Sequence, residues 1–390
     1  MKFRSPDGRT VRLNYVASAH PAPDLAGVQS ALEKYAREVR ERLEVETLGV
    51  TLLLPQVAAE EIDGSPAALE SLRRTLADCG VEVTGIHGVP VRMYDPKRRY
   101  GVFRPDWAEP ERLESTLRLT RILAGLLPED ETEGVVSTIP FFWRTRNDRV
   151  TRRAAEEALL RLADELERQR DATGKAVRVV MEPEPGCAVE TSAAAGQWLS
   201  ELFGSRLVGD AQETWLGLCL DTCHMAVQFE DATDAFERLP ELRPAVLKLQ
   251  ISNALLSSTP SEELDSLEAF VDPARLHQTR ERRVDGTVYG VDDLSAAIPG
   301  GLPGDSEWRI HYHMPVYLAD QTTQHLTNDL LRRVLGTVDS VIHFETETYT
   351  WPMLPSHLRP NPRDWIAEGI AGELRWARAV FESEGYALVR

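Results

Sequence analysis

The chain has 390 residues, 42% of them hydrophobic, and its 62 acidic and 44 basic side chains give a formal net charge of -18. This acidic balance argues against a nucleic-acid binder, whose affinity comes from clustered Lys and Arg. The cysteines, Cys79, Cys187, Cys219 and Cys223, are too few for a disulfide framework. No apolar run approaches the roughly 20 residues of a membrane helix, and no secretion signal is evident. We therefore expect a cytoplasmic protein that acts on a small-molecule metabolite, with neither nucleic acid nor membrane as a partner.

Short apolar runs recur along the chain, and each is followed by a charged amphipathic stretch. The runs are 13–19, 48–54, 81–87, 134–140, 177–183, 216–221, 245–252 and 339–347. The helical stretches include 27–44, 111–127, 151–170 and 362–383. Strands that alternate with helices predict a parallel sheet. Eight such units predict an α/β fold, a (β/α)8 TIM barrel in one domain that spans 1–390.

The segment 253–317 does not fit the eightfold count. Residues 308–317 would be a ninth extended run, and 253–307 is rich in Gly and Pro without a clean period. We interpret 253–317 as an insertion-like loop after strand seven that carries "HYH" over the barrel mouth, with 327–336 as the seventh helix. An alternative stays open, in which 308–313 is a core strand and an earlier run is peripheral.

Polar residues fall on one face at the ends of the late strands. Alternate residues of a barrel strand face the interior and the helix layer, and active sites gather at the C-terminal ends of the strands. This alternation turns the following side chains inward at four strand ends: Glu182, Asp221, Gln250, and Glu345 or Glu347. Three acids at one barrel mouth would repel one another without a cation. The pattern therefore predicts a divalent metal site.

Histidines add to this prediction. His224 follows Asp221 by three residues, and His311 and His313 are spaced so that both lie on one face of an extended chain. Two further histidines end the first and third runs, His20 and His87. We assign no site role to His277, His325 and His357. Carboxylates with imidazoles suit Zn, Mn, Co or Fe, and Mg less well if a histidine binds directly.

Two cysteines lie next to these residues in the sequence. Cys219 should pack inside the barrel, where a free cysteine behaves as a small hydrophobic residue. Cys223 is the more plausible thiolate ligand of the two, although a spacer role is the simpler interpretation.

Taken in order, "VVMEPEPG", "CLDTCH", "KLQIS" and "HFETE" resemble the ends of strands five to eight in the xylose isomerase-like TIM-barrel superfamily. That superfamily includes sugar phosphate isomerases and epimerases and the endonuclease IV type of DNA repair enzyme. More narrowly, "LNYVASAHP", "HYHMPVY" and "FETETYTWPMLP" resemble the EboE metabolite-traffic family. The superfamily likeness spans nearly the whole chain, and its strength lies in the order of short motifs.

The resemblance implies metal binding through Glu182, Asp221, the strand-seven position and Glu345. In the epimerase branch that strand-seven ligand is normally histidine, whereas this chain has Gln250. We choose His313 to supply the missing imidazole. His224 resembles a metal ligand in the endonuclease-like branch and a substrate contact in the epimerase-like branch, and the sequence leaves both open. Strand four offers no ligand for the three-metal cluster of the endonuclease branch, so at most a two-metal site is expected.

The leading hypothesis is a metal-dependent isomerase or epimerase. The metal would polarise a carbonyl of a small polyhydroxylated metabolite, and Glu182 and Glu345 would exchange protons from opposite sides of it. The other candidate substrate contacts are His20, His87, Lys248, His224, His311, Glu347 and Trp143.

Two alternatives belong to other classes of function. The first is a metal-dependent hydrolase of a phosphoester, for which Arg144 and Arg146 are the candidate phosphate contacts. The second is a non-catalytic protein that binds or hands over a metabolite, in keeping with the EboE likeness. Barrels share folds far more widely than functions, so the fold does not rank these three.

Overall fold

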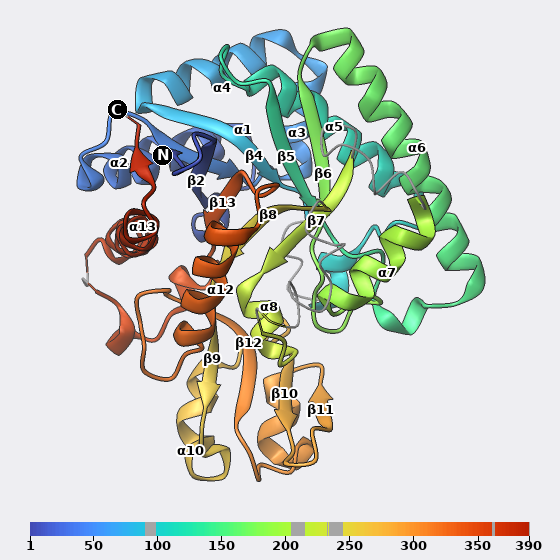
Figure 1. The fold of residues 1–390 in the computed structure, drawn as a ribbon, viewed down its shortest axis with the longest axis vertical. Coiled ribbons are helices and arrows are strands. Elements are labelled where there is room, and N and C mark those ends of the chain that lie inside the picture. The colour runs from blue at the N-terminus through green and yellow to red at the C-terminus, as the bar shows by residue number, and fades with distance from the viewer. Residues whose placement is uncertain (90–98, 204–214, 232, 234–244, 361–362, 390) are drawn as a thin grey trace.

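Eight parallel strands close into a barrel in the computed structural model, which describes residues 1–89, 99–203, 215–231, 233, 245–360 and 363–389 (Figure 1). The barrel strands are β2 (Thr10–Val16), β3 (Leu48–Leu52), β4 (Val81–His87), β5 (Glu133–Thr138), β6 (Ala176–Met181), β7 (Leu216–Asp221), β8 (Val246–Ile251) and β13 (His343–Thr346). Each pairs in parallel with the next, and β13 pairs with β2 to close the barrel. Each of the eight predicted runs overlaps one of these strands, so the predicted barrel is confirmed.

Helices between the strands form the outer layer (Figure 1). They are α1 (Leu25–Ala31), α2 (Arg37–Leu43), α3 (Gln56–Gly64), α4 (Pro66–Cys79), α5 (Pro110–Leu126), α6 (Arg149–Thr173), α7 (Ser192–Phe203), α8 (Thr222–Val227), α12 (Gln324–Thr337) and α13 (Trp365–Ser383). In α6, Asp148 caps the first turn through its side chain, and Gly174 ends the helix with φ 73°. Leu159, Leu162 and Leu166 are buried at helical spacing. No helix of the described ranges is both long and apolar enough to cross a membrane.

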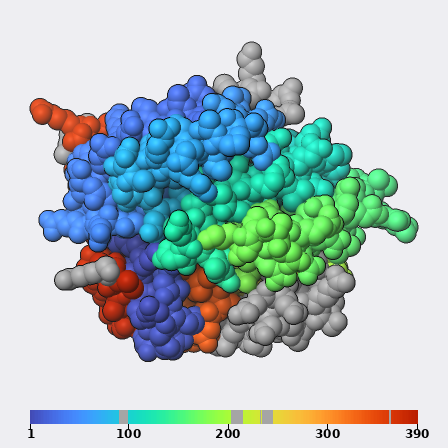
Figure 2. Space-filling view, turned by 90° about the horizontal axis from the view of Figure 1, so that it is seen from above, coloured from blue at the N-terminus to red at the C-terminus, as the bar shows by residue number. Residues whose placement is uncertain are grey.

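The two ends of the chain lie together at the edge of the barrel opposite the mouth. β1 (Lys2–Arg4) pairs antiparallel with β14 (Ala387–Leu388) and with the first residues of β2. Figure 2 shows this contact as dark blue and red atoms side by side, next to the blue-to-green outer surface of the N-terminal half. The C-terminal ends of the barrel strands lie at the other end of the barrel, where the candidate site is found.

A second, antiparallel sheet follows β8. Its strands are β9 (Asn253–Ser257), β10 (Thr279–Arg282), β11 (Val288–Val291) and β12 (Trp308–Met314), in the order β11-β10-β12-β9 (Figure 1). Because β12 pairs with β9 and β10 and with no barrel strand, the alternative that placed 308–313 in the barrel is wrong. The short α10 (Pro260–Leu267) and α11 (Leu294–Ala296) lie between these strands. The predicted seventh helix is present as α12.

Candidate metal centre at the barrel mouth

Three buried carboxylates converge where β6, β7 and β13 end. Glu182, Asp221 and Glu347 are at most 4% exposed, and one oxygen of each lies within 4.8 Å of the other two. Burial and the charge of Asp221 raise the pKa of Glu182 to about 8. Burial, together with the charge of Glu182, raises the pKa of Glu347 well above its ordinary value. Such crowding of acids in a low dielectric is costly, and a cation would relieve it.

Gln250 lies among these three carboxylates. Its Nε2 donates to Glu182 Oε1 at 3.1 Å, to Asp221 Oδ2 at 2.9 Å and to Glu347. The side chain is fully buried, and its amide oxygen faces the Cys219 sulfur at 3.7 Å. The predicted metal ligand of strand seven is therefore at the centre, with its nitrogen directed at the acids.

The "DTCH" motif is a helix cap as well as part of the site. Asp221 Oδ1 accepts from the backbone N–H groups of Cys223 at 2.7 Å and His224 at 3.0 Å, and from Ser252 Oγ at 2.7 Å. These bonds begin α8 and leave Oδ2 directed at the mouth. The spacing of three residues thus places the carboxylate and the imidazole on one side of the strand end.

Three histidines are oriented toward one another at this mouth. The Nδ1 atoms of His224, His311 and His313 each contact a carbonyl oxygen, which favours the proton on Nδ1 and a lone pair on Nε2. The acceptors are, in that order, Pro183 O at 2.9 Å, Gln278 Oε1 at 2.7 Å and Glu347 O at 2.9 Å. His224 Nε2 and His311 Nε2 lie 3.0 Å apart. His313 Nε2 is buried, has no hydrogen-bond partner in the described ranges, and lies 4.0 Å from Asp221 Oδ2.

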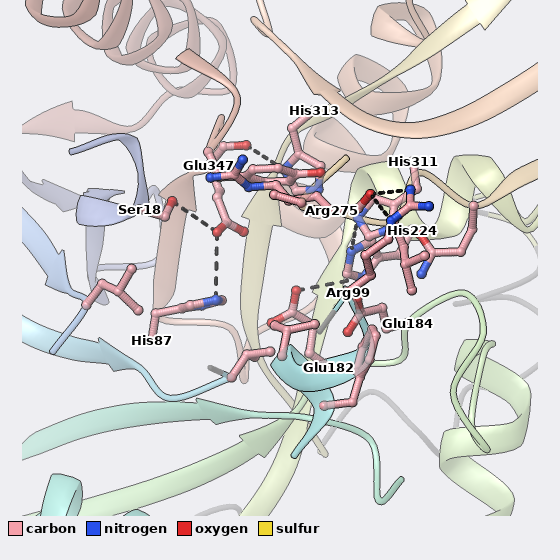
Figure 3. A pocket seen from close by; sticks show the side chains of 18 residues that line it. Ser18, His87, Arg99, Glu182, Glu184, His224, Arg275, His311, His313 and Glu347 are labelled. Atoms are coloured by element: carbon pink, nitrogen blue, oxygen red, sulfur yellow. Dashed lines mark hydrogen bonds and ion pairs between the residues drawn. The ribbon is translucent and has the colours of Figure 1, made fainter. Parts of the chain in front are cut away.

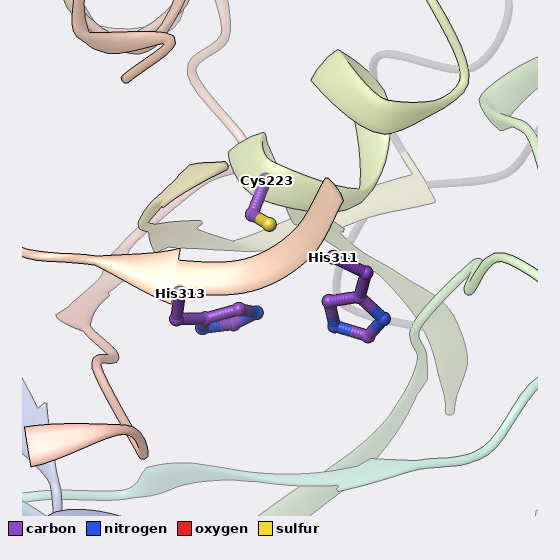
Figure 4. Close-up of side chains that lie close together, drawn as sticks. All are labelled: Cys223, His311 and His313. Atoms are coloured by element: carbon purple, nitrogen blue, oxygen red, sulfur yellow. The ribbon is translucent and has the colours of Figure 1, made fainter. Parts of the chain in front are cut away.

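The cysteines of the motif pack as small apolar residues. Cys219 packs with Val180 and Leu247, as expected from the sequence. Cys223 lies beside β12, and its sulfur is within 4.8 Å of imidazole nitrogens of His311 and His313 (Figure 4). Burial raises the pKa of the Cys223 thiol well above its usual value, so without a metal the sulfur stays protonated.

Glu345, predicted as a metal ligand and as an acid or base, is instead held in a closed ion pair. Its Oε1 lies 2.5 Å from Lys248 Nζ, and its Oε2 accepts from Thr51 Oγ1 at 2.6 Å. Lys248 also donates to Ser137 Oγ at 2.5 Å and is completely buried. Neither Glu345 nor Lys248 is among the cavity-lining residues that the structure describes. Glu347, predicted as a substrate contact, is the carboxylate that reaches Glu182 and Asp221.

The stagger of the barrel explains this difference. Inward side chains of neighbouring strands alternate between successive layers of a TIM barrel. Glu345 is level with Gln250 in the pairing of β13 and β8. Its side chain nevertheless contacts Lys248 and Thr51, while Gln250 contacts Glu347, two residues further along. The alternation of side chains along a strand predicts whether a side chain faces the barrel interior, but not which layer of the interior it occupies.

A cavity of about 140 Å³ is lined by two of the three carboxylates, Glu182 and Glu347 (Figure 3). Its polar lining residues are Ser18, His87, Arg99, Glu182, Glu184, His224, Arg275, Gln278, His311, His313 and Glu347. Its apolar and aromatic lining residues are Leu53, Val89, Val102, Phe103, Ala274, Leu276 and Tyr349. The lining of the cavity therefore combines charged and polar groups with apolar side chains.

Besides Lys248, two further predicted substrate contacts lie outside the lining of this cavity. His20 Nε2 contacts Tyr15 Oη at 3.0 Å, and the His20 ring stacks on Tyr35 with centroids 5.1 Å apart. Trp143 packs on Phe103 with ring centroids 4.7 Å apart. A Cβ on Gly186 would lie 2.1 Å from the Trp143 ring, so that glycine is needed for this packing. Both side chains are buried by local packing and do not line the cavity.

His87 and His311 do line the cavity, and Glu184 joins them although the sequence had not singled it out. His87 Nε2 lies 3.8 Å from Glu347 Oε1. Glu184 is close to His224 and His311, with one ligand atom of each within 4.8 Å of the others. Burial raises the pKa of Glu184 to about 8. Its spacing of two residues from Glu182 was the signal that could have revealed it.

No model of a known protein family matches the chain, and no curated protein matches it. A solved structure from Anabaena variabilis, described as a candidate sugar phosphate isomerase/epimerase, is similar with TM-score 0.54 and 12% identity over 97% of this chain and 100% of that one. A xylose isomerase-like TIM-barrel protein from Mycobacterium smegmatis, in complex with magnesium, is similar with TM-score 0.51 and 14% identity over 98% and 94%. At these identities the likeness shows the shared fold alone.

Proposed function

We propose that the chain is a divalent-metal-dependent isomerase or epimerase that moves a proton on a small polyhydroxylated carbonyl compound. The observation that carries the proposal is the convergence of Glu182, Asp221 and Glu347, with one oxygen of each within 4.8 Å of the others, beside a cavity that Glu182 and Glu347 line. The described structures of similar fold include a magnesium complex and a candidate sugar phosphate isomerase/epimerase. They support the proposal by analogy.

The residues present fit a divalent cation. Glu182 Oε2 and His313 Nε2 are both buried without a hydrogen-bond partner in the described ranges, which is costly unless a cation or proton satisfies them. Glu182, Asp221, Glu347 and His313 would hold the ion, with the amide oxygen of Gln250 as a further ligand. Three carboxylates with one imidazole suit Mn, Co, Fe or Zn, and an oxygen-only subset of them suits Mg.

A divalent ion bound there would withdraw electron density from a substrate carbonyl and make the hydrogen on the neighbouring carbon more acidic. Glu182 and Glu347 come from strands β6 and β13, on different sides of the barrel mouth. One ionised carboxylate would take the proton from the carbon, and the bonding pair would move toward the carbonyl. The other, protonated carboxyl would return a proton to carbon. No electrons are gained or lost overall, so the step needs no redox partner.

The remaining polar side chains would position the substrate. His224 has its Nδ1 bound to Pro183 and its Nε2 beside His311, so we assign it to the substrate side of the centre. His87 and Ser18 lie on the opposite side, beside Glu347 (Figure 3). These groups match the hydroxyl and carbonyl oxygens of a polyhydroxylated compound.

Exchange of substrate hydrogen with solvent deuterium tests the proposal. Protein stripped with EDTA and reloaded with Mn²⁺ would be incubated in D2O with a panel of ketoses, aldoses and their phosphates. We expect deuterium at the carbon next to the carbonyl of at least one compound, only with metal, and not with Glu182→Gln. Glu60→Gln, on the exposed surface of α3, is the matched control. Absence of exchange by the metal-loaded wild type across the panel would reject the proton-transfer function.

The EboE likeness supports a second candidate, a protein that binds and hands over a metabolite without converting it. Gln250, at a position where the epimerase branch normally has histidine, is the observation that favours it. Calorimetry separates the two, because a carrier binds a panel compound and exchanges no hydrogen. For the hydrolase alternative, Arg144 and Arg146 pair with Asp292 and Asp106. Neither arginine therefore supports that alternative as a phosphate contact, and its test is cleavage of a generic phosphodiester in Mn²⁺ or Zn²⁺.

A further inference from the structure

We infer that the Gln250 amide takes the place of the cation among the carboxylates when no metal is bound. In the structure its amide nitrogen contacts the three carboxylates, and when a metal binds the amide turns to present its oxygen. The inference rests on the proposed function, because it concerns the same centre of Glu182, Asp221 and Glu347. It adds a determinant of how tightly, and which, metal is held.

The contacts of Gln250 carry the first half of the inference. Its Nε2 is within 3.1 Å of Glu182 Oε1 and 2.9 Å of Asp221 Oδ2, and it also donates to Glu347. No other side chain of the described ranges donates to all three. An amide nitrogen has two N–H protons, so three acceptors exceed its capacity. Glu182 Oε2 is buried and has no hydrogen-bond partner in the part of the chain that the structure describes, so the amide leaves an acceptor that a cation would satisfy.

The chemistry of the amide carries the second half. A glutamine amide has a donor end and an acceptor end of similar size, and a half-turn about its last side-chain torsion exchanges them without moving the carbon atoms. In the structure the acceptor end faces Cys219 Sγ at 3.7 Å. A thiol is both a weak donor and a weak acceptor, so it tolerates either end of the amide. The surroundings of Gln250 therefore accommodate both orientations.

This dual role predicts weak and exchangeable metal binding. Before the amide oxygen can bind a cation, the hydrogen bonds from the Gln250 N–H groups to the carboxylates must break. The free energy of these hydrogen bonds therefore lowers the apparent affinity for the metal. A carboxylate at the same position would provide a stronger oxygen ligand and no donor. The isosteric change Gln250→Glu should therefore weaken the empty centre and tighten the filled one.

Melting and calorimetry of EDTA-treated protein test this pair of effects. We expect Gln250→Glu to melt several degrees below wild type without metal, to bind Mn²⁺ at least tenfold more tightly, and to gain more in melting temperature on saturation. The matched control is Gln169→Glu on α6, where the amide donates to Thr120 O at 2.9 Å, away from the centre. It should lower the melting temperature and leave the Mn²⁺ affinity unchanged.

Gln250→Met, which has neither N–H nor oxygen and carries no charge, is the second variant in case Gln250→Glu does not fold. It should bind Mn²⁺ at least tenfold more weakly than wild type. Unchanged Mn²⁺ affinity in either variant, or weaker binding by Gln250→Glu, would overturn the inference. If wild type itself binds no divalent ion, the proposed function fails as well. If wild type binds metal and exchanges hydrogen while the variants behave like it, only the role of Gln250 fails.

Discussion

Glu345 lies on β13 and Glu347 directly follows that strand, two residues further along, yet their surroundings differ. Glu345 has a lysine at 2.5 Å and a threonine hydroxyl at 2.6 Å. Glu347 lies among other acids and accepts from Ser18 and Gln250. The nearby basic group is an imidazole, with His87 Nε2 lying 3.8 Å from Glu347 Oε1. One carboxylate is therefore charge-balanced by a lysine, and the other lies among acids, where the proposed cation would balance it.

This contrast distinguishes a buried carboxylate with a structural role, Glu345, from a buried carboxylate with a proposed functional role, Glu347. A balanced pair such as Lys248 and Glu345 fills the barrel interior and has no opening to the cavity. An unbalanced cluster lines a cavity, where a cation and a substrate can enter. Perturbed pKa values alone do not distinguish the two, because structural ion pairs shift them as well.

The largest expected effect is on catalysis at Glu347. Glu347→Gln should lower the rate of hydrogen exchange by about 100-fold to 10,000-fold, the range typical for loss of a general acid or base. Glu345→Gln, in the fraction that stays folded, should keep most of the exchange rate. Exchange rates per folded molecule for both variants check the comparison. An equal loss in both would remove the distinction between the two carboxylates.

The next largest effect is on stability at Glu345. Glu345→Gln leaves Lys248 buried without its counter-charge, and loss of one partner of a buried pair costs about 3–5 kcal/mol. Urea unfolding of the metal-free protein measures this cost. Replacing both partners, as in Lys248→Met with Glu345→Leu, should recover most of it. If Glu345→Gln is no less stable than wild type, the ion pair is not structural.

A smaller effect concerns pH. Burial raises the pKa of Glu182 to about 8, with Asp221 as a further cause, and burial raises that of Glu373 on α13 to about 7. Both folded-state values exceed the unfolded value near 4.5, so the folded protein binds more protons at intermediate pH. The contribution of these two carboxyls to metal-free stability is full below about pH 4.5 and is lost as the pH rises through 7 to 8. Buried histidines with lowered pKa, such as His87 and His313, have the opposite effect below their ordinary pKa of 6.5. Melting curves in EDTA from pH 7 to 8.5 therefore measure the slope due to the carboxyls, and Mn²⁺ should reduce it by removing the part due to Glu182. A slope of opposite sign would contradict these assignments.

The smallest effect is expected at Arg144, whose side chain is 40% exposed and pairs with Asp292. Exposed ion pairs contribute about 0–1 kcal/mol. Arg144→Ala should therefore change the free energy of unfolding by less than about 1 kcal/mol and leave hydrogen exchange unchanged. A large loss of activity in this variant would instead support a phosphate contact and the hydrolase alternative.

Strand order and strand-end chemistry were predictable from the sequence, because they depend on local periodicity. The alternation of strands and helices gave the barrel, and Glu182, Asp221 and Gln250 lie together as the inward pattern required. The layer of Glu345 was not predictable, because it depends on the stagger between β8 and β13.

Contacts made by loops were also beyond the sequence. The interpretation of His20 as a substrate contact rested on its place after a strand, but its ring turns away onto Tyr35. Trp143 turns similarly onto Phe103. The expectation for "HYH" rested on extended spacing, and β12 does present His311 and His313 to the cavity. An extended strand fixes side-chain direction, whereas an irregular loop does not.

A titration of Mn²⁺ into EDTA-treated protein tests the central claim most directly. We expect one ion per chain at the mouth, no binding by Glu347→Gln, and unchanged stoichiometry in the folded fraction of Glu345→Gln. Absence of binding by the wild type, or loss of binding in Glu345→Gln with retention in Glu347→Gln, would contradict the account.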